Sequence, residues 1–128
     1  MNNLSREKGF TLIEVLIGVI ILAIGVLAIA GMQITSTRGN FFSNNLMQAT
    51  YVAQDRLELL KNTDIGDGLL SNGSHADAPP VTFSGVVYNR AYTVAPDPAG
   101  SGYKLITYVV TWNDGVDHNV SFSTIRSQ

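Results

Sequence analysis

The sequence predicts an α+β protein in which a long N-terminal helix packs on a small antiparallel β-sheet. Residues 15–32 contain no charged side chain and no strongly polar one. Residues 46–60 repeat apolar side chains at three- and four-residue spacing, which is typical of an amphipathic helix. The last third of the chain alternates apolar and polar residues, which is typical of strands with one buried face. We therefore expect one helix with a membrane-spanning half and an amphipathic half, followed by a sheet.

The first half of the helix has the length and composition of a membrane span. A run of about 18 or more apolar residues can cross the core of a bilayer as a helix. A helix is needed there because lipid offers the backbone no hydrogen-bond partners. Arg6 and Lys8 precede the run. By the positive-inside rule they place the N-terminus in the cytoplasm and the chain after Met32 outside.

Three interpretations of this N-terminal region remain open. A secretory signal is one, because Ala28-Ile29-Ala30 provides a small-x-small cleavage site. A plain anchor is the second, in which Glu14 is stabilised near a helix N-terminus by ~0.3–1 kcal/mol. The third rests on the run Gly9-Phe10-Thr11-Leu12-Ile13-Glu14, joined to a basic leader and an unbroken apolar helix. This combination resembles the N-terminal segment of type IV pilins and type II secretion pseudopilins.

The resemblance implies specific roles for three residues. Residues 1–9 would be a prepilin leader peptide that prepilin peptidase removes after Gly9. Phe10 would become the N-terminus and be N-methylated by the same enzyme, and Glu14 would act in subunit assembly. The implied partners are other pilin subunits, the peptidase/N-methyltransferase, the inner-membrane assembly machinery and the membrane itself. The implied location is the inner membrane, single-pass with a periplasmic head, and then the pilus at the cell surface.

A physical argument for Glu14 stands beside the resemblance. An ionised acid in a membrane-spanning helix costs ~2.5–3.5 kcal/mol and usually marks a partner of opposite charge. Cleavage after Gly9 would create such a partner, the free amine of Phe10 on a neighbouring copy. Contacts of this head-to-neighbour kind are heterologous, so they build an open filament rather than a closed ring.

The amphipathic continuation is expected over residues 33–63, with Gly39-Asn40 as a possible bend. Its apolar stripe comprises Leu46, Ala49, Val52, Ala53, Leu57 and Leu60, and the helix is expected to stop at Asn62. The sequence of residues 22–28, followed by Met32-Gln33 and residues 53–57, looks most like PilV-type minor pilins, with I-type pseudopilins as the nearest rival. Such relatives are implicated in pilus assembly, cell adhesion and twitching motility.

Residues 64–128 are expected to form a loop and an antiparallel sheet. The Gly-, Ser-, Asp- and Pro-rich residues 64–80 predict a connecting loop. Its acids Asp64, Asp67 and Asp77 do not have the spacing of a calcium loop and are interpreted as turn formers. Three or four strands should follow. The predicted inward-facing residues are Val86, Tyr88, Tyr92, Val94, Ile106, Tyr108, Val110, Trp112, Val120 and Phe122, with Arg90 interrupting the first run and Asn113-Asp114-Gly115 forming a hairpin. A short strand at residues 81–83 is also predicted.

Composition argues against several other function classes. The net charge is −2, and the sequence has no basic patch of the density that nucleic-acid binding needs. The chain has no cysteine, so disulfides and thiol chemistry are excluded. His75 and His118 are far apart in sequence, and neither a nucleophile motif nor a phosphate-binding loop is present. We therefore expect no enzyme activity, no cofactor and no metal. We interpret the aromatic residues of the sheet region as core residues, namely Tyr88, Tyr92, Tyr103, Tyr108 and Trp112.

Overall fold

The computed structural model describes residues 9–127, and its longest element is helix α1, Leu12–Asn62. The helix starts two residues later than the sequence predicts, because Thr11 occupies the position before the first turn and its hydroxyl accepts a bond from the Glu14 amide at 3.3 Å. It ends at Asn62, as predicted. Helix α1 is continuous through Gly39-Asn40, where the sequence allows a bend. The basic leader residues Arg6 and Lys8 lie outside the described residues.

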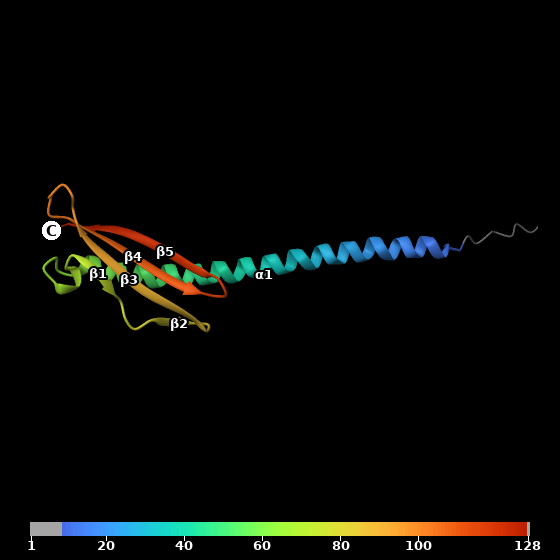
Figure 1. Ribbon diagram of the computed structural model, residues 1–128, viewed down its shortest axis with the longest axis horizontal. Helices are drawn as coiled ribbons and strands as arrows, with labels where there is room; N and C mark the ends of the chain where they lie inside the picture. Colours follow the sequence, from blue (N-terminus) through green and yellow to red (C-terminus); the bar gives the residue numbers. More distant parts are fainter. Residues whose placement is uncertain (1–8, 128) are drawn as a thin grey trace, which may run out of the picture. The chain divides into compact units, whose positions relative to one another are not determined.

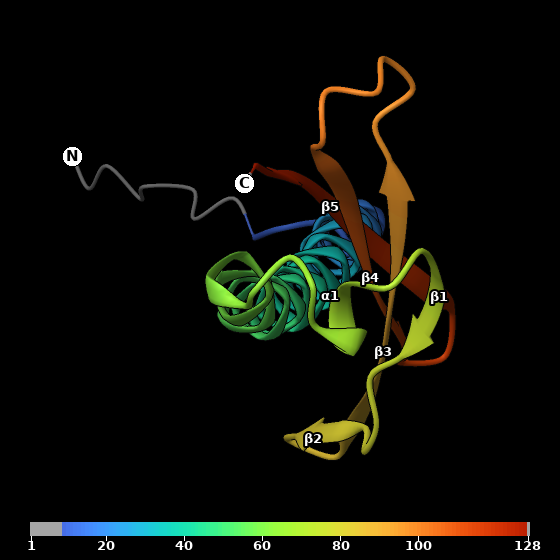
Figure 2. The same cartoon turned by 90° about the vertical axis from the view of Figure 1, so that its left-hand side faces the viewer.

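The chain divides into two units within α1, residues 1–41 and residues 42–128, and the second unit contains the whole β-sheet. The sheet has five antiparallel strands: β1 (Gly73–Ala76), β2 (Val81–Phe83), β3 (Val86–Pro96), β4 (Lys104–Asn113) and β5 (Asp117–Arg126). Their order is β1-β3-β4-β5, and β2 also pairs with β3. Figure 1 shows β3, β4 and β5 as the long strands, and Figure 2 shows them beside residues 42–62 of α1. The α+β prediction is therefore confirmed.

Short turns fix the register of the long strands. The pairing of Asn113 with Asp117 closes β4 and β5 around a three-residue loop in which Gly115 has φ 110°. This is the hairpin that the sequence predicts, and glycine is suited to the left-handed region. The short strand at residues 81–83 is also confirmed. It joins β3 through Ser84 and Gly85, both with positive φ, the backbone typical of a two-residue hairpin.

The core of the head lies between the predicted helix stripe and the predicted inward face of the sheet. Ala49, Val52, Ala53 and Leu60 are buried, and Leu46 and Leu57 pack against them. From the sheet, the buried residues are Tyr88, Tyr92, Val94, Ile106, Tyr108, Val110 and Trp112, with Val86, Val120 and Phe122 partly buried at the border. Ala49 and Ala53 are small, so the helix can pack against the aromatic side chains of the sheet. The apolar stripe of the helix and the apolar face of the sheet therefore cover each other.

Two features of the head contradict the sequence-based prediction. Residues 64–80 are not simply a loop, because they contain a 3-10 turn, Gly68–Leu70, and strand β1. Strand β1 has a polar, loop-like composition, but it pairs residue for residue with the second half of β3, so its backbone is satisfied by the sheet. The sheet consequently has five strands rather than three or four.

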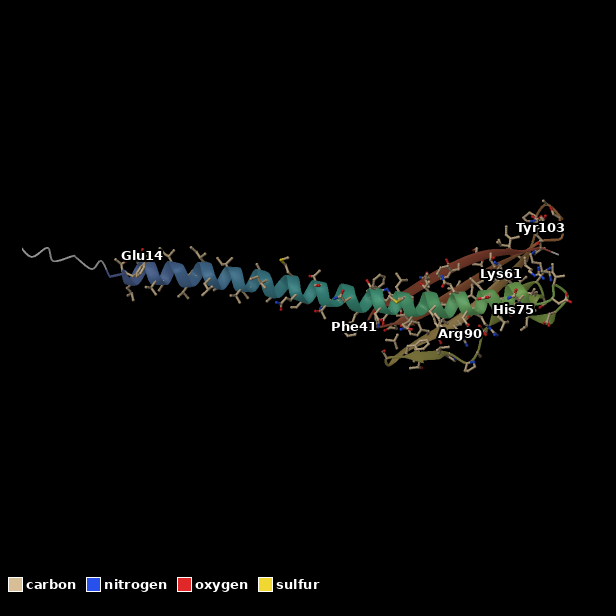
Figure 3. The ribbon with its side chains drawn as sticks, turned by 180° about the vertical axis from the view of Figure 1, so that it is seen from behind. Glu14, Phe41, Lys61, His75, Arg90 and Tyr103 are labelled. Atoms are coloured by element: carbon tan, nitrogen blue, oxygen red, sulfur yellow. The ribbon has the colours of Figure 1, made fainter. Side chains whose placement is uncertain are left out.

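Of two further side chains, one agrees with the prediction and one does not. Arg90 interrupts the apolar alternation within one strand, as predicted, and β3 runs unbroken to Pro96. It lies on the same face as Tyr88 and Tyr92, and its guanidinium donates to the Pro79 carbonyl at 2.6 Å. Tyr103 is not a core residue, since it is 45% exposed. Figure 3 shows it on the loop that joins β3 to β4, one residue before β4 begins, so the sheet's alternation does not constrain it.

Candidate functional site

The N-terminal end of α1 presents the three residues that the sequence singles out. Gly9, Phe10 and Glu14 are all exposed, and the Phe10 side chain is 81% exposed. Figure 3 shows Glu14 in the first turn of α1. Thr11 accepts the Glu14 amide through both its hydroxyl and its carbonyl. Thr11 thus satisfies the amides of Glu14 and Val15, and among residues 9–127 no side chain forms a salt bridge with the Glu14 carboxylate.

The apolar stretch that follows is exposed on all sides of the helix. Within the described residues, α1 is long and apolar enough to cross a membrane, and none of its most apolar 18-residue window is buried. Side chains such as Leu22 and Leu27 are 66% and 72% exposed. An added Cβ at Gly18 or Gly25 would meet no atom within 4 Å, so both positions leave room for a neighbouring helix. Such a surface needs lipid or other apolar helices around it.

Within the head, the most buried charge is Asp77, which sequence reasoning placed among the turn formers. Its side chain is 4% exposed. Its carboxylate accepts from Arg56 Nε at 2.8 Å and from the Tyr108 hydroxyl at 2.6 Å. Arg90 lies 4.0 Å away. Burial and this carboxylate raise the pKa of Tyr108, so the phenol stays protonated and donates. The cluster joins the β1–β2 connection to the helix and the sheet.

No local signal reveals the role of Asp77, because its partners come from distant parts of the sequence. The only available hint is that two arginines, Arg56 and Arg90, fall within or beside apolar patterns and need a buried acid. The other two loop acids are turn formers, as predicted. Asp64 accepts the Gly66 amide at 3.1 Å, and Asp67 accepts the Leu69 amide at 2.8 Å.

A second polar cluster fixes the β4–β5 hairpin to the helix. Asn45, which is buried, donates to the Asp114 carboxylate at 2.8 Å. His118 contacts the other oxygen of Asp114 at 3.0 Å and stacks on Trp112. The Asn45 hydrogen bond, followed by the charge of His118, lowers the pKa of Asp114. The turn therefore carries an ionised acid that binds the helix.

The two histidines lie in different places, as their separation in sequence predicts. His118 belongs to the hairpin cluster, whereas His75 on β1 stacks on Tyr92 and contacts the Ser71 carbonyl at 2.7 Å. In residues 9–127, no three His, Asp or Glu side chains come close enough together to hold a metal ion. Both rings are engaged in packing and local hydrogen bonds.

A small apolar hollow of about 180 Å³ lies where the β3–β4 loop meets the ends of the strands. It is lined by Asp97, Pro98, Tyr103, Leu105 and Ile125. The Asp97 carboxylate accepts the amides of Ala99 and Ser101, and these bonds lower its pKa. The Asp97 carboxylate is therefore engaged by the backbone of its own loop. The other lining residues leave the hollow with a mainly apolar surface.

Comparison with known proteins identifies the N-terminal segment. Residues 4–30 match the prokaryotic N-terminal methylation motif. No curated protein and no solved structure matches the chain. The matched motif supports a type IV pilin-like or pseudopilin-like precursor, and it points to a structural subunit rather than an enzyme. It contains Gly9, Phe10 and Glu14, the residues that the sequence selects.

Proposed function

We propose that the chain is a minor type IV pilin of the PilV type, a structural and assembly subunit of the pilus. The proposal divides it into a leader (1–9), a membrane and assembly helix (10–32), an amphipathic helix (33–63) and a head (64–128). The observation that carries it is the fully exposed apolar half of α1, most of which lies within the methylation motif at residues 4–30 and which contains a single acid. Such a segment is suited to burial among like helices.

In this proposal, processing and assembly are linked by charge. Cleavage after Gly9 exposes the amine of Phe10, and N-methylation of that amine leaves it able to carry a positive charge. Glu14 of a neighbouring subunit then binds this amine in an apolar environment, where an unpaired carboxylate is costly. Because the amine and the carboxylate come from different copies, each subunit has one of each to offer. The contact repeats and builds an open filament.

The membrane orientation rests on the positive-inside rule, because Arg6 and Lys8 precede the apolar run. Before assembly, the leader faces the cytoplasm, the helix of residues 10–32 crosses the inner membrane and the head is periplasmic. After assembly, the subunit is part of the pilus, where the functions would include adhesion and twitching motility. The partners are other pilins, prepilin peptidase/N-methyltransferase and the assembly machinery.

An I-type pseudopilin of type II secretion is the second candidate, because the methylation motif is common to both classes. The genes that neighbour this one distinguish the two. A released binding module, cleaved after Ala30, is the third. It would require cutting within α1, which runs unbroken past that residue.

The experiment is to measure incorporation of subunit variants into filaments sheared from cells, relative to the amount in the membrane. Glu14→Ala and Glu14→Gln are expected to reach wild-type membrane levels but to be strongly depleted from filaments. The matched control is Glu58→Ala, an exposed acid in the amphipathic part of the same helix. If Glu14→Ala enters filaments at the wild-type level, Glu14 has no assembly role.

A further inference from the structure

The two sides of the β-sheet are protected very differently. On one side, β1 and β2 have four and three residues, and the segment between them contains Pro79-Pro80. Short strands and prolines are common ways to prevent unwanted pairing. On the other side, β5 is ten residues long and pairs with β4 at every position, without a bulge. No described residue pairs with its outer edge.

Strand β5 also lacks the side chains that usually block an open edge. It contains no proline and no lysine, and its formal charges, Asp117 and Arg126, stand at its two ends. Its outward-facing residues Asn119, Ser121 and Ser123 are small or polar and exposed, and the apolar Ile125 lies outward near its C-terminal end. On the helix side, Val120 and Phe122 are only half-buried, at the border of the core. An added strand with apolar residues on the helix side and a polar residue on the outside would complete this border.

Strand β2 has that pattern. Val81 and Phe83 are half-buried on the helix side, where Phe83 packs against the core, whereas Thr82 is exposed. Its second edge is also free among the described residues, because its one partner is β3. If β2 is placed against β5 of another copy with Thr82 opposite Ser121, then Val81 lies opposite Phe122 and Phe83 lies opposite Val120. The two residues of each pair then lie on the same face of the sheet, Thr82 and Ser121 on the outside and the other two pairs on the helix side.

The strand directions allow this contact between copies that point the same way. Across the sheet, β2, β3, β4 and β5 alternate in direction, so β2 runs antiparallel to β5. Two heads side by side in one orientation therefore present antiparallel edges to each other. Pairing β5 with β5 of a second copy would instead require one head to be inverted. Subunits that share one membrane or filament, as the proposed function requires, point the same way.

We propose that β2 of one copy adds to the open edge of β5 of the next, which extends the antiparallel sheet between neighbouring heads. The pairing is heterologous, so it can repeat from subunit to subunit. Within one head, Val81 pairs with Tyr88, Tyr88 with Trp112, and Trp112 with His118. Val81 and His118 therefore lie at the same height along the strand direction. Opposing Val81 to Phe122 displaces the next head by four residues, about 13 Å along the strands. The contact thus defines an axial stagger.

Site-specific disulfides test the pairing, because the natural chain has no cysteine. The full-length chain is made in membranes as Thr82→Cys and as Ser121→Cys, and the two are co-expressed and oxidised. Directly opposed antiparallel residues have Cα atoms about 4.5–5.5 Å apart, within the disulfide range of about 4.4–6.8 Å. The expected result is a mixed Thr82–Ser121 dimer at least several-fold more abundant than with the control Thr93→Cys plus Ser121→Cys. Thr93 is an exposed residue of the central strand β3.

A scan of the outward positions reads the register. Asn119→Cys and Ser123→Cys are expected to couple to Thr82→Cys less than Ser121→Cys does. A mixed dimer no more abundant than the control overturns the proposal, and so does coupling confined to Ser121 with Ser121. The mature N-terminus is determined on the same samples. Processed protein that enters filaments without the Thr82–Ser121 link refutes this inference alone, whereas a chain that still begins at Met1 refutes the proposed function.

Discussion

Replacing Asp77 by alanine is expected to destabilise the head by about 3 kcal/mol. Removing one partner of a buried ion pair typically costs ~3–5 kcal/mol, because the other charge stays buried. Here Arg56 is 27% exposed and can regain water, which favours the low end of that range. The Tyr108 hydroxyl is buried and loses its acceptor, a loss of about 1–3 kcal/mol by itself. Single domains are stable by only ~5–15 kcal/mol, so the effect is large.

Urea unfolding of the full-length protein in detergent measures this effect, with fluorescence of Trp112 as the signal. Trp112 is the chain's only tryptophan and is buried in the head. With a urea dependence of ~1–3 kcal/mol/M, the unfolding midpoint should fall by about 1–3 M. Asp55→Ala, at an exposed acid beside Arg56, is the control and should change stability by less than about 0.5 kcal/mol. A loss below about 1 kcal/mol for Asp77→Ala would refute the reasoning.

Two further predictions concern the contacts between helix and sheet. Asp114→Asn should be less stable than wild type at neutral pH, and the difference should shrink on acidification. The pKa of Asp114 is lowered by folding, so its contribution is present above the ordinary value of 3.8 and is lost as pH falls through the lower folded value. A difference that stays constant from pH 7 to pH 2 would contradict this. Ala53→Leu should cost ~1–3 kcal/mol, because Ala53 has no exposed surface. Gln54→Leu, at the exposed neighbouring residue, should not lower the stability in this way. Equal losses of stability for the two variants would contradict the tight contact between helix and sheet.

Patterns within one element allow much of the fold to be predicted. Spacing alone identifies the helix stripe at Ala49, Val52, Ala53 and Leu60. Strict alternation identifies the inward face of β4, because a strand buried on one face repeats every two residues. The end of α1 and the β4–β5 hairpin follow from local turn chemistry.

What the sequence does not predict depends on distant partners. Strand β1 has the composition of a loop, and it becomes a strand because β3 extends past β2 and offers a free edge. Asp77 resembles a turn former, and only the folded chain brings Arg56 and Tyr108 to it. The environment of Glu14 is a different case. The partner proposed for Glu14 belongs to another copy. The structure of one chain therefore shows that Glu14 is exposed and that Thr11 accepts its amide, but it does not contain that partner.

The mature N-terminus of the native protein tests the central claim most directly. Mass spectrometry of protein isolated from its own cells should find a chain that begins at Phe10 with a methylated amine. The Gly9→Lys variant should keep its leader and begin at Met1. A Cβ added at Gly9 meets no atom within 4 Å among the described residues, so the substitution should leave the fold of the head intact. A native chain that begins at Gly31, or that retains Met1, would contradict the account.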